Sequence, residues 1–322
     1  MRRVLAILVP GPLSARSNMR RLLEGILPPL ATPFTADGDL ALDDLCRNVE
    51  RLNGLGLTGY VALGTNGEAV HLSGEEASLV FRAVRAAAAP GMRVIAGTGR
   101  ASTRETLELT RRAADDGCDA ALVLNPFFFR GSMTEEALRR HYEAVAEGSP
   151  IPIFLYTMPA ATGVDVPASV AAALAPHPNV AGMKDSGGDV GKLAELVRVT
   201  QGHEFAIASG NFAASLPATT FGVKAAILAV ANVAPRECVR LMALALSEDA
   251  GDRSEAARIH LALLPVARAV TTGFGVAGLK AAHELIGLHG GFPRAPLLPL
   301  REEARRELAR VFETAGVGPL PA

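Results

Sequence analysis

Short apolar runs alternate with longer amphipathic runs along most of the chain. The apolar runs are about four to eight residues long and mostly end at, or directly before, Gly, Asn, Pro or Ser, as buried parallel strands do. They are Gly25–Thr32, Gly59–Leu63, Arg93–Gly97, Ala120–Leu124, Ile151–Tyr156, Val180–Lys184, Phe205–Ser209 and Ala225–Val230. The pattern predicts eight strands that are buried on both faces.

Helix signals stand between these runs. Ser73, followed by acidic residues, predicts a helix that begins there. Ser102 opens another helix, which is expected to end before Gly117, and Thr134 opens a third. Strand–helix units of roughly 25–30 residues favour an α/β fold, a (β/α)8 TIM barrel. A doubly wound parallel sheet fits the same alternation and is the second architecture.

The two ends of the chain differ from its middle. Residues 1–22 hold an arginine pair and a short apolar run that prolines interrupt. We expect a disordered tail there, or a true start at Met19, rather than a secretory signal. A catalytic barrel domain is expected over residues 23–245 and a C-terminal helical domain over residues 246–322. The helices of that domain are predicted at Ala256–Ala269, Leu279–Leu288 and Arg301–Ala315.

Composition narrows the class of protein. The 32 Lys plus Arg against 33 Asp plus Glu give a net charge of −1, which disfavours a nucleic-acid or anionic-membrane partner. Cys46, Cys118 and Cys238 lie far apart without metal-ligand spacing, which fits a reducing compartment. No apolar run approaches the ~20 residues of a membrane span. We expect a cytoplasmic enzyme that needs no metal and no cofactor.

Lysine is scarce, and this makes each lysine a candidate for chemistry that needs an amine. Arginine supplies 28 of the 32 basic side chains, and the four lysines are Lys184, Lys192, Lys224 and Lys280. Lys184 alone combines an apolar approach with the C-terminal end of a predicted strand, where TIM barrels keep their chemistry. Lys192 is expected to be solvated. The alternative for Lys184 is a structural ion pair with neighbouring Asp185.

The chemistry expected of Lys184 is imine formation. A neutral lysine amine attacks a carbonyl, and the resulting imine stabilises negative charge on the adjacent carbon. Aldol cleavage and dehydration of 2-oxo acids both need this. Tyr156 ends the preceding predicted strand, where a phenol could move a proton near Lys184, or could simply cap the barrel core. Tyr60 and Tyr142 are expected to be structural.

Two polar turns follow other predicted strands. Gly64-Thr65-Asn66-Gly67-Glu68 comes after the second strand, and its two glycines allow a sharp turn and close approach of the backbone to a ligand. Its hydroxyl, amide and backbone N–H groups suit a carboxylate, whereas the spacing of a phosphate-binding loop is missing. Ser209-Gly210-Asn211 follows the seventh strand and could face the same mouth.

These motifs together resemble the dihydrodipicolinate synthase and N-acetylneuraminate lyase superfamily of pyruvate-dependent class I aldolases and lyases. The resemblance rests on Gly64–Glu68, on Tyr156–Pro159 with Thr162-Gly163, and on Gly182–Ser186, and it extends over about residues 24–315. It implies a TIM barrel with a C-terminal helical domain. It also implies that Lys184 is the Schiff-base lysine, that Tyr156 transfers protons, and that Thr65 and Asn66 hold the pyruvyl carboxylate.

Within this superfamily the chain most resembles 4-hydroxy-2-oxoglutarate aldolase. The supporting stretches are His177–Val190, Arg130–Met133, Phe274–Lys280, Gly290-Gly291 and Arg294–Leu297. The expected catalytic residues are Lys184, Tyr156 and Thr65, and the expected substrate-binding residues are Thr65, Asn66, Gly67, Ser186, Ser209 and Gly210. The resemblance further implies a small 2-oxo acid as substrate and a homotetramer built from tight dimers.

Two positions depart from the family pattern. Synthases of lysine biosynthesis carry an arginine two residues after the proline of the tyrosine motif, where this chain has Ala161. A buried carboxylate without a cation costs several kcal/mol, so Ala161 disfavours the synthase reaction. The family also often has a tyrosine that reaches into a neighbouring subunit's site, and Phe128 takes that position here.

Three functions remain open on the sequence. The first is retro-aldol cleavage of 4-hydroxy-2-oxoglutarate, or of a similar 4-hydroxy-2-oxo acid, to pyruvate and an aldehyde. The second is a Schiff-base dehydratase or hydratase-aldolase acting on a sugar-derived or aryl 2-oxo acid, which the apolar run Phe127–Phe129 favours. The third is a barrel that binds a 2-oxo acid without turnover, which the presence of Lys184 and Tyr156 disfavours.

Overall fold

Eight parallel strands form the centre of the molecule, in a computed structural model that describes residues 22–320. The strands are β1 (Gly25–Ile26), β2 (Gly59–Ala62), β3 (Arg93–Gly97), β4 (Ala120–Leu124), β5 (Ile153–Thr157), β6 (Val180–Asp185), β7 (Ala206–Ser209) and β8 (Ala225–Ala226). Their order, β1-β8-β7-β6-β5-β4-β3-β2, follows the chain without the reversal of a doubly wound sheet. A parallel bridge between Pro29 and Val61 joins the first segment to β2. The predicted TIM barrel is confirmed.

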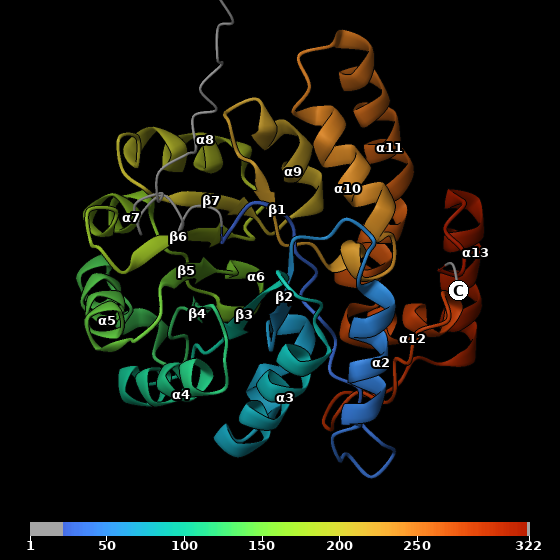
Figure 1. The fold of residues 1–322 in the computed structure, drawn as a ribbon, viewed down its shortest axis with the longest axis horizontal. Helices are drawn as coiled ribbons and strands as arrows, with labels where there is room; N and C mark the ends of the chain where they lie inside the picture. Colours follow the sequence, from blue (N-terminus) through green and yellow to red (C-terminus); the bar gives the residue numbers. More distant parts are fainter. Residues whose placement is uncertain (1–21, 321–322) are drawn as a thin grey trace, which may run out of the picture.

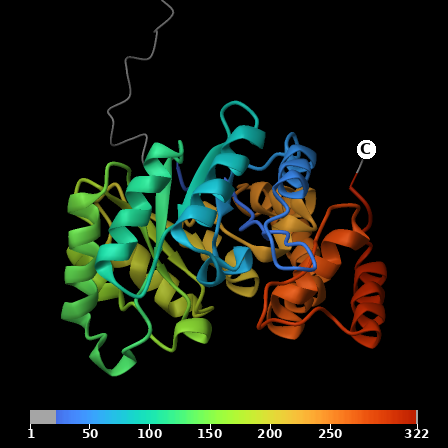
Figure 2. The ribbon, with the colours of Figure 1, turned by 90° about the horizontal axis from the view of Figure 1, so that it is seen from below.

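Helices surround the strands and continue beyond them (Figure 1). Those that alternate with the strands are α2 (Leu42–Leu52), α3 (Gly74–Ala87), α4 (Thr103–Asp115), α5 (Glu135–Gly148), α6 (Pro159–Thr162), α7 (Ala168–Leu174), α8 (Val190–Val199), α9 (Phe212–Thr219) and α10 (Pro235–Ala245). Three more follow, α11 (Ala250–Arg268), α12 (Gly275–Leu285) and α13 (Glu302–Ala315). Figure 2 shows these last helices together on one side of the barrel. The predicted division at residue 246 stays a prediction.

The helix starts follow the signals in the sequence. Ser73 caps α3 and accepts from the Glu76 backbone N–H while the Glu76 side chain accepts from the Ser73 backbone, which is a complete capping box. Ser102 caps α4 and Thr134 caps α5 in the same way through their hydroxyl groups. Each cap satisfies a backbone donor that the first turn leaves unpaired. The sequence therefore fixes where these barrel helices begin.

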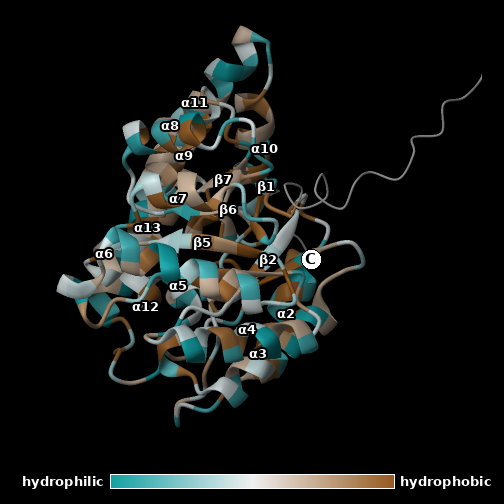
Figure 3. Cartoon of the chain, turned by 90° about the vertical axis from the view of Figure 1, so that its left-hand side faces the viewer, coloured by the Kyte–Doolittle hydropathy of each residue, from teal (hydrophilic) through white to brown (hydrophobic). Residues whose placement is uncertain are grey.

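Apolar side chains fill the inside of the barrel and the layer between strands and helices. The inner cluster includes Leu27, Val61, Ile95, Leu122 and Phe154, one side chain from each of five segments around the ring. Figure 3 shows hydrophobic residues concentrated on the central strands, whereas the outer turns of the helices are largely hydrophilic. Burial of this apolar surface is the main favourable contribution to the stability of the barrel.

The first and the eighth predicted strands are much longer than the observed ones. Only Gly25–Ile26 of the first predicted strand and Ala225–Ala226 of the eighth form ladders. The chain turns after β8 into a 3-10 helix, Ala229–Asn232, and the amide of Asn232 donates to Pro29 O at 3.0 Å. This bond ties the end of the eighth segment to the first, and apolar character alone cannot distinguish such a turn from a strand.

The structure does not test the predicted N-terminal tail. The predicted N-terminal tail lies, apart from Leu22, outside the described residues. Between residues 22 and 320, no helix combines the length and the apolar character that a membrane crossing requires.

Candidate functional site

Strands β5 and β6 place Tyr156 and Lys184 side by side. The two residues are register partners, and the Lys184 amine nitrogen lies 4.1 Å from the centre of the Tyr156 ring. Each residue is only 3% exposed, and both stand near the C-terminal ends of their strands. Within residues 22–320 the amine has no ion-pair or hydrogen-bond partner. A nucleophile and a proton-transfer group could therefore act on one bound carbonyl.

The hydroxyl of Tyr156 lies in a small cluster that β2 and β5 build together. It is 3.0 Å from the Thr65 Oγ1 and 3.2 Å from the Met158 sulfur. The buried Tyr142 donates its hydroxyl to the Tyr156 carbonyl oxygen at 3.3 Å. Burial raises the pKa of Tyr142, so this phenol stays a neutral donor behind Tyr156. The structure thus brings Thr65 to Tyr156 and gives Tyr142 the structural place that the sequence suggests.

Asp185 does not pair with Lys184. It lies on the opposite side of β6, where its carboxylate is fully buried and accepts from the Gly187 backbone at 2.8 Å. Lys192 forms the ion pair instead, at 2.8 Å from Asp185 and 2.5 Å from Asp165. The prediction that Lys192 is solvated is wrong, since its side chain is only 14% exposed. The acid that could have bound the Lys184 amine is already neutralised.

Ser186 and Gly210 meet beside Lys184. A Cβ on Gly210 would stand 1.9 Å from the Ser186 Oγ and 2.7 Å from the Lys184 Cε, so a larger residue there would displace one of these two side chains. Both expected substrate-binding residues thus lie next to the Lys184 side chain. Ser209 is not brought to the site, because its buried hydroxyl donates to the Asn211 carbonyl oxygen at 2.9 Å and the neighbouring Ala208 takes the inward position.

The turn that carries Thr65, Asn66 and Gly67 has an unusual backbone at both ends. Leu63 and Glu68 are the residues other than glycine with positive φ in the described part of the chain, at 57° and 56°. Such conformations are costly for residues with a side chain and cluster at functional sites. Gly67 is buried, and its carbonyl oxygen accepts from the Thr32 hydroxyl at 2.9 Å. Asn66 is half-buried at the start of the turn.

A cavity of about 270 Å³ opens above Tyr156 and the Thr65 turn. Its walls are mostly apolar and include Val70, Leu122, Leu124, Phe127 and Ala161. Phe128 does not line it and is 73% exposed, next to Phe129 at 70%. The wall formed by Ala161 offers no cation to a bound substrate.

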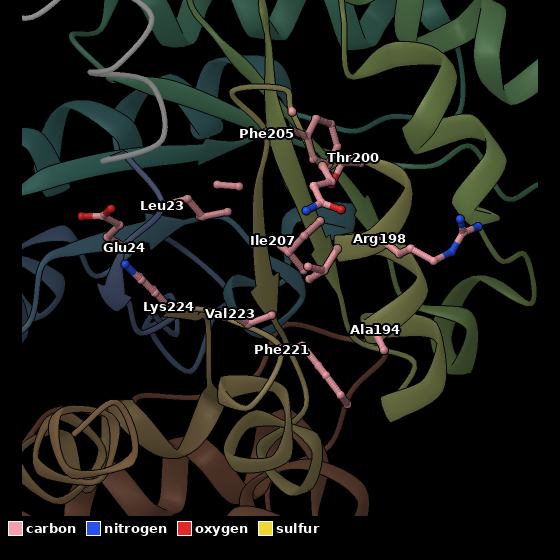
Figure 4. A pocket seen from close by; sticks show the side chains of 15 residues that line it. Leu23, Glu24, Ala194, Arg198, Thr200, Phe205, Ile207, Phe221, Val223 and Lys224 are labelled. Carbon is pink, nitrogen blue, oxygen red and sulfur yellow. The ribbon is translucent and has the colours of Figure 1, made fainter. Parts of the chain in front are cut away.

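A second, larger cavity of about 600 Å³ lies at the opposite end of the barrel. Figure 4 shows Glu24 and Lys224 on one side of it and Arg198 on the other. Lys224 comes directly before β8, which places this cavity at the N-terminal ends of the strands. Conserved chemistry in TIM barrels sits at the other end, so the cavity is not the candidate active site.

The sequence interpretation passed over three cations that the structure places near the site. Lys192 holds Asp185, and Lys280 is buried against Glu68 at 2.5 Å. Arg130 packs on Gly163, where a Cβ would stand 2.9 Å from its Nη1. The scarcity of lysine was a usable signal for the first two, because it applied to them as much as to Lys184.

Comparison with known proteins shows to which family the chain belongs. The model of the dihydrodipicolinate synthetase family matches residues 22–315. The chain belongs to this family. The expected lyase class is confirmed with it, and the TIM barrel is that of the family's solved structures.

Relatives and solved structures resemble the chain over nearly its whole length. A protein of Methanothrix thermoacetophila named 4-hydroxy-tetrahydrodipicolinate synthase is 37% identical over 291 residues, 90% of this chain and 96% of its own. A chloride-inhibited dihydrodipicolinate synthase from Acinetobacter baumannii, complexed with pyruvate, is 33% identical with a TM-score of 0.85 and covers 92% of this chain and 99% of its own. YagE, a prophage member of the family from E. coli K12 in complex with pyruvate, is 30% identical with a TM-score of 0.84, covering 91% and 99%.

The names of these relatives bear on which member of the family the chain most resembles. The family is as expected, whereas the closer resemblance to 4-hydroxy-2-oxoglutarate aldolase finds no support among these relatives, which are named as synthases or, for YagE, only as a member of the family. The identity of the second product or substrate therefore has to be argued from the cavity.

Proposed function

We propose that the chain is a class I lyase that cleaves a 4-hydroxy-2-oxo acid into pyruvate and an aldehyde through an imine on Lys184. The observation that carries the proposal is the Lys184 amine, which lies 4.1 Å from the Tyr156 ring centre while the adjacent Asp185 is bound to Lys192. An amine that no acid holds can attack the carbonyl of a bound 2-oxo acid. The pyruvate in two related structures supports the same substrate class.

The turn at Thr65 is the proposed site of the substrate's 1-carboxylate. The backbone N–H groups of Gly67 and Glu68 donate within the turn, to Gly64 O and Thr65 O. Those of Thr65 and Asn66, at the start of the turn, have no partner in the described part of the chain. Free first-turn amides and a hydroxyl suit an anionic carboxylate. The 2-oxo carbon would then face Lys184.

The proposed reaction proceeds by transfer of one proton at each end of the broken bond. Loss of water from the adduct on Lys184 leaves a protonated imine, and the Tyr156 phenol supplies the proton that turns the departing hydroxide into water. The resulting Tyr156 phenolate takes the proton of the 4-hydroxyl, the bond between C3 and C4 breaks, and its electrons neutralise the protonated imine as an enamine while the aldehyde departs. The enamine regains a proton at C3, and water hydrolyses the imine to release pyruvate and the free amine of Lys184. The contact of 3.0 Å between Thr65 Oγ1 and Tyr156 OH provides a path for the transferred proton.

The first candidate substrate is 4-hydroxy-2-oxoglutarate. The cavity of about 270 Å³ is at the small end of ligand sites. The hydroxyl of Ser186, beside the Lys184 side chain, is the proposed donor to the distal carboxylate of a short substrate. Ala161 gives a longer substrate carboxylate no cation deeper in the cavity.

Two other reactions have one observation each in their favour. The apolar walls, Leu122, Leu124 and Phe127, suit the aldehyde part of an aryl 2-oxo acid in a hydratase-aldolase or dehydratase reaction. The synthase reaction has the names of the relatives in its favour. Arg130, packed on Gly163 two residues from Ala161, would be the cation for the second substrate in that case.

A panel assay separates these reactions. Pyruvate release is followed with lactate dehydrogenase on 4-hydroxy-2-oxoglutarate and on an aryl 4-hydroxy-2-oxo acid, beside condensation of pyruvate with aspartate semialdehyde. The proposal expects turnover of 4-hydroxy-2-oxoglutarate and negligible condensation. Pyruvate release from the aryl acid alone, or strong condensation, would replace it by the corresponding alternative.

We further propose that the chain assembles as the homotetramer that the family resemblance implies. Phe128 and Phe129 are 73% and 70% exposed and pack on one another at 5.1 Å, an apolar surface that suits burial against a second copy. A related structure is of a monomeric synthase variant. Sedimentation at micromolar concentration tests the proposal, and a monomer there would contradict it.

A further inference from the structure

Glu68, at the end of the turn that starts with Thr65, is held by residues far away in the sequence. Its side chain is 1% exposed, and one carboxylate oxygen lies 2.5 Å from the amine of Lys280 on α12, which is also 1% exposed. The second carboxylate oxygen accepts from the Arg294 backbone N–H at 2.9 Å and lies 3.1 Å from the His71 Nδ1. Both carboxylate oxygens of the buried Glu68 therefore have partners. One oxygen contacts α12, and the other contacts Arg294 in the segment after α12 as well as His71.

Lys280 is itself fixed from three sides. Its amine donates to the Phe292 carbonyl oxygen at 2.6 Å and lies 4.4 Å from the centre of the Phe34 ring, besides its contact with Glu68. Burial lowers the pKa of Lys280, and Glu68 opposes that shift. A buried charge that loses its partner is strongly destabilising, so the two side chains depend on each other.

The geometry points to the Glu68–Lys280 ion pair as a positioning device through which the C-terminal helices set the carboxylate-binding turn. Glu68 needs a left-handed backbone, with φ of 56°, which costs free energy unless its surroundings enforce it. The contacts of the Lys280 amine and of the Arg294 backbone N–H with its carboxylate supply that enforcement. The inference rests on the proposed function, because it takes the turn at Thr65 as the site of the 1-carboxylate.

The test compares two ketones of similar size, pyruvate and hydroxyacetone, of which only pyruvate has a carboxylate. Each is incubated with the full-length protein and cyanoborohydride, and the half-saturating concentration for the adduct at Lys184 is measured by peptide mass. A charged hydrogen bond is worth about tenfold to a hundredfold in affinity. Lys280→Met is expected to raise the half-saturating concentration of pyruvate by about that factor and to change that of hydroxyacetone by less than about threefold. A merely structural role would affect both ketones equally.

Two further variants make the result decisive. The double variant Glu68→Gln with Lys280→Met removes both buried charges, so it serves if the single variant does not fold, and a loss of pyruvate preference in it cannot come from repulsion by an unpaired Glu68. Arg294→Met is the matched control, since its guanidinium donates to Glu76 and to the carbonyl oxygens of Gly38 and His71 and not to Glu68, whereas its backbone N–H still donates to Glu68. It should keep the wild-type preference.

Each outcome has one meaning. Wild-type preference in the folded double variant, or an equal loss in Arg294→Met, would overturn the inference, as would a wild-type protein that traps both ketones equally well. Failure of the wild-type protein to form any adduct at Lys184 would overturn the proposed function instead, which keeps the two failures distinguishable.

Discussion

Lys184 and Tyr156 are register partners on β6 and β5, with the amine of one 4.1 Å from the ring centre of the other. Parallel pairing makes this proximity a consequence of the backbone, because side chains opposite one another on adjacent strands point to the same face. The inward face at the C-terminal ends of barrel strands is where such pairs meet a substrate. The proposed imine chemistry depends on that pair of side chains.

Replacing Tyr156 by Phe removes the hydroxyl that lies 3.0 Å from Thr65 Oγ1 and leaves the packing nearly unchanged. A general acid–base group contributes about 10²–10⁴-fold, and a loss of kcat in that range is expected with an unchanged Tm. Tyr60→Phe is the matched control, since its hydroxyl bonds to Asn53 at 2.9 Å away from the site. A Tyr156 variant within about threefold of the wild-type rate would make Tyr156 a core residue.

Replacing Ala161 by Arg adds a cation to the apolar wall of the cavity. Condensation of pyruvate with aspartate semialdehyde should then rise by at least about tenfold, because a charged hydrogen bond to the second substrate's carboxylate is gained. Initial rates of the two proteins at equal pyruvate concentration provide the comparison. If the wild-type protein already condenses pyruvate with aspartate semialdehyde rapidly, Ala161 does not disfavour the synthase reaction. A loss in Arg130→Gln would then identify Arg130 as the cation.

Replacing Lys192 by Met leaves the carboxylate of Asp185 buried without its cation. The free energy of unfolding is expected to fall by about 3 kcal/mol, as when one partner of a buried pair is removed. The double variant with Asp185→Asn should recover most of that loss, because the amide can still accept from the Gly187 backbone. Urea unfolding of the three proteins measures this, and a change below about 0.5 kcal/mol would make the pair a surface contact.

Because His141 is buried, we expect the free energy of unfolding to depend on pH. Burial lowers the pKa of His141 to about 4, from an ordinary value near 6.5. Between these two pH values the folded state therefore binds fewer protons than the unfolded state. The stabilisation by neutral His141 is complete above pH 6.5. As the pH falls toward 4 the free energy of unfolding decreases, by at most roughly 3 kcal/mol. His141→Gln should flatten that slope in denaturant unfolding at several pH values. Part of the slope will remain, because burial also lowers the pKa of His283 to about 4. An unchanged slope would contradict the assignment.

Much of this arrangement was predictable because it is local. The strands Arg93–Gly97 and Ala120–Leu124 coincide with their apolar runs, and Ser73, Ser102 and Thr134 are the observed caps. Lys184 and Tyr156 could be selected because strand ends meet at one face of a barrel.

The remaining features depend on contacts that sequence spacing does not encode. Lys192 looks solvated until Asp165, 27 residues earlier, is folded against it. Lys280 reaches Glu68 only because α12 packs beside the barrel. Ser209 follows a strand, but its side chain faces away from the inside of the barrel, since the alternation of the strand places Ala208 inward.

The most direct test of the account is the covalent adduct at Lys184. Wild-type protein incubated with pyruvate and cyanoborohydride should gain one adduct, and peptide mass should map it to Lys184 alone among the four lysines. Lys184→Arg keeps the charge but has no nucleophilic amine, and it should gain none. An adduct that persists in Lys184→Arg, or one that maps to Lys192, Lys224 or Lys280, would contradict the account.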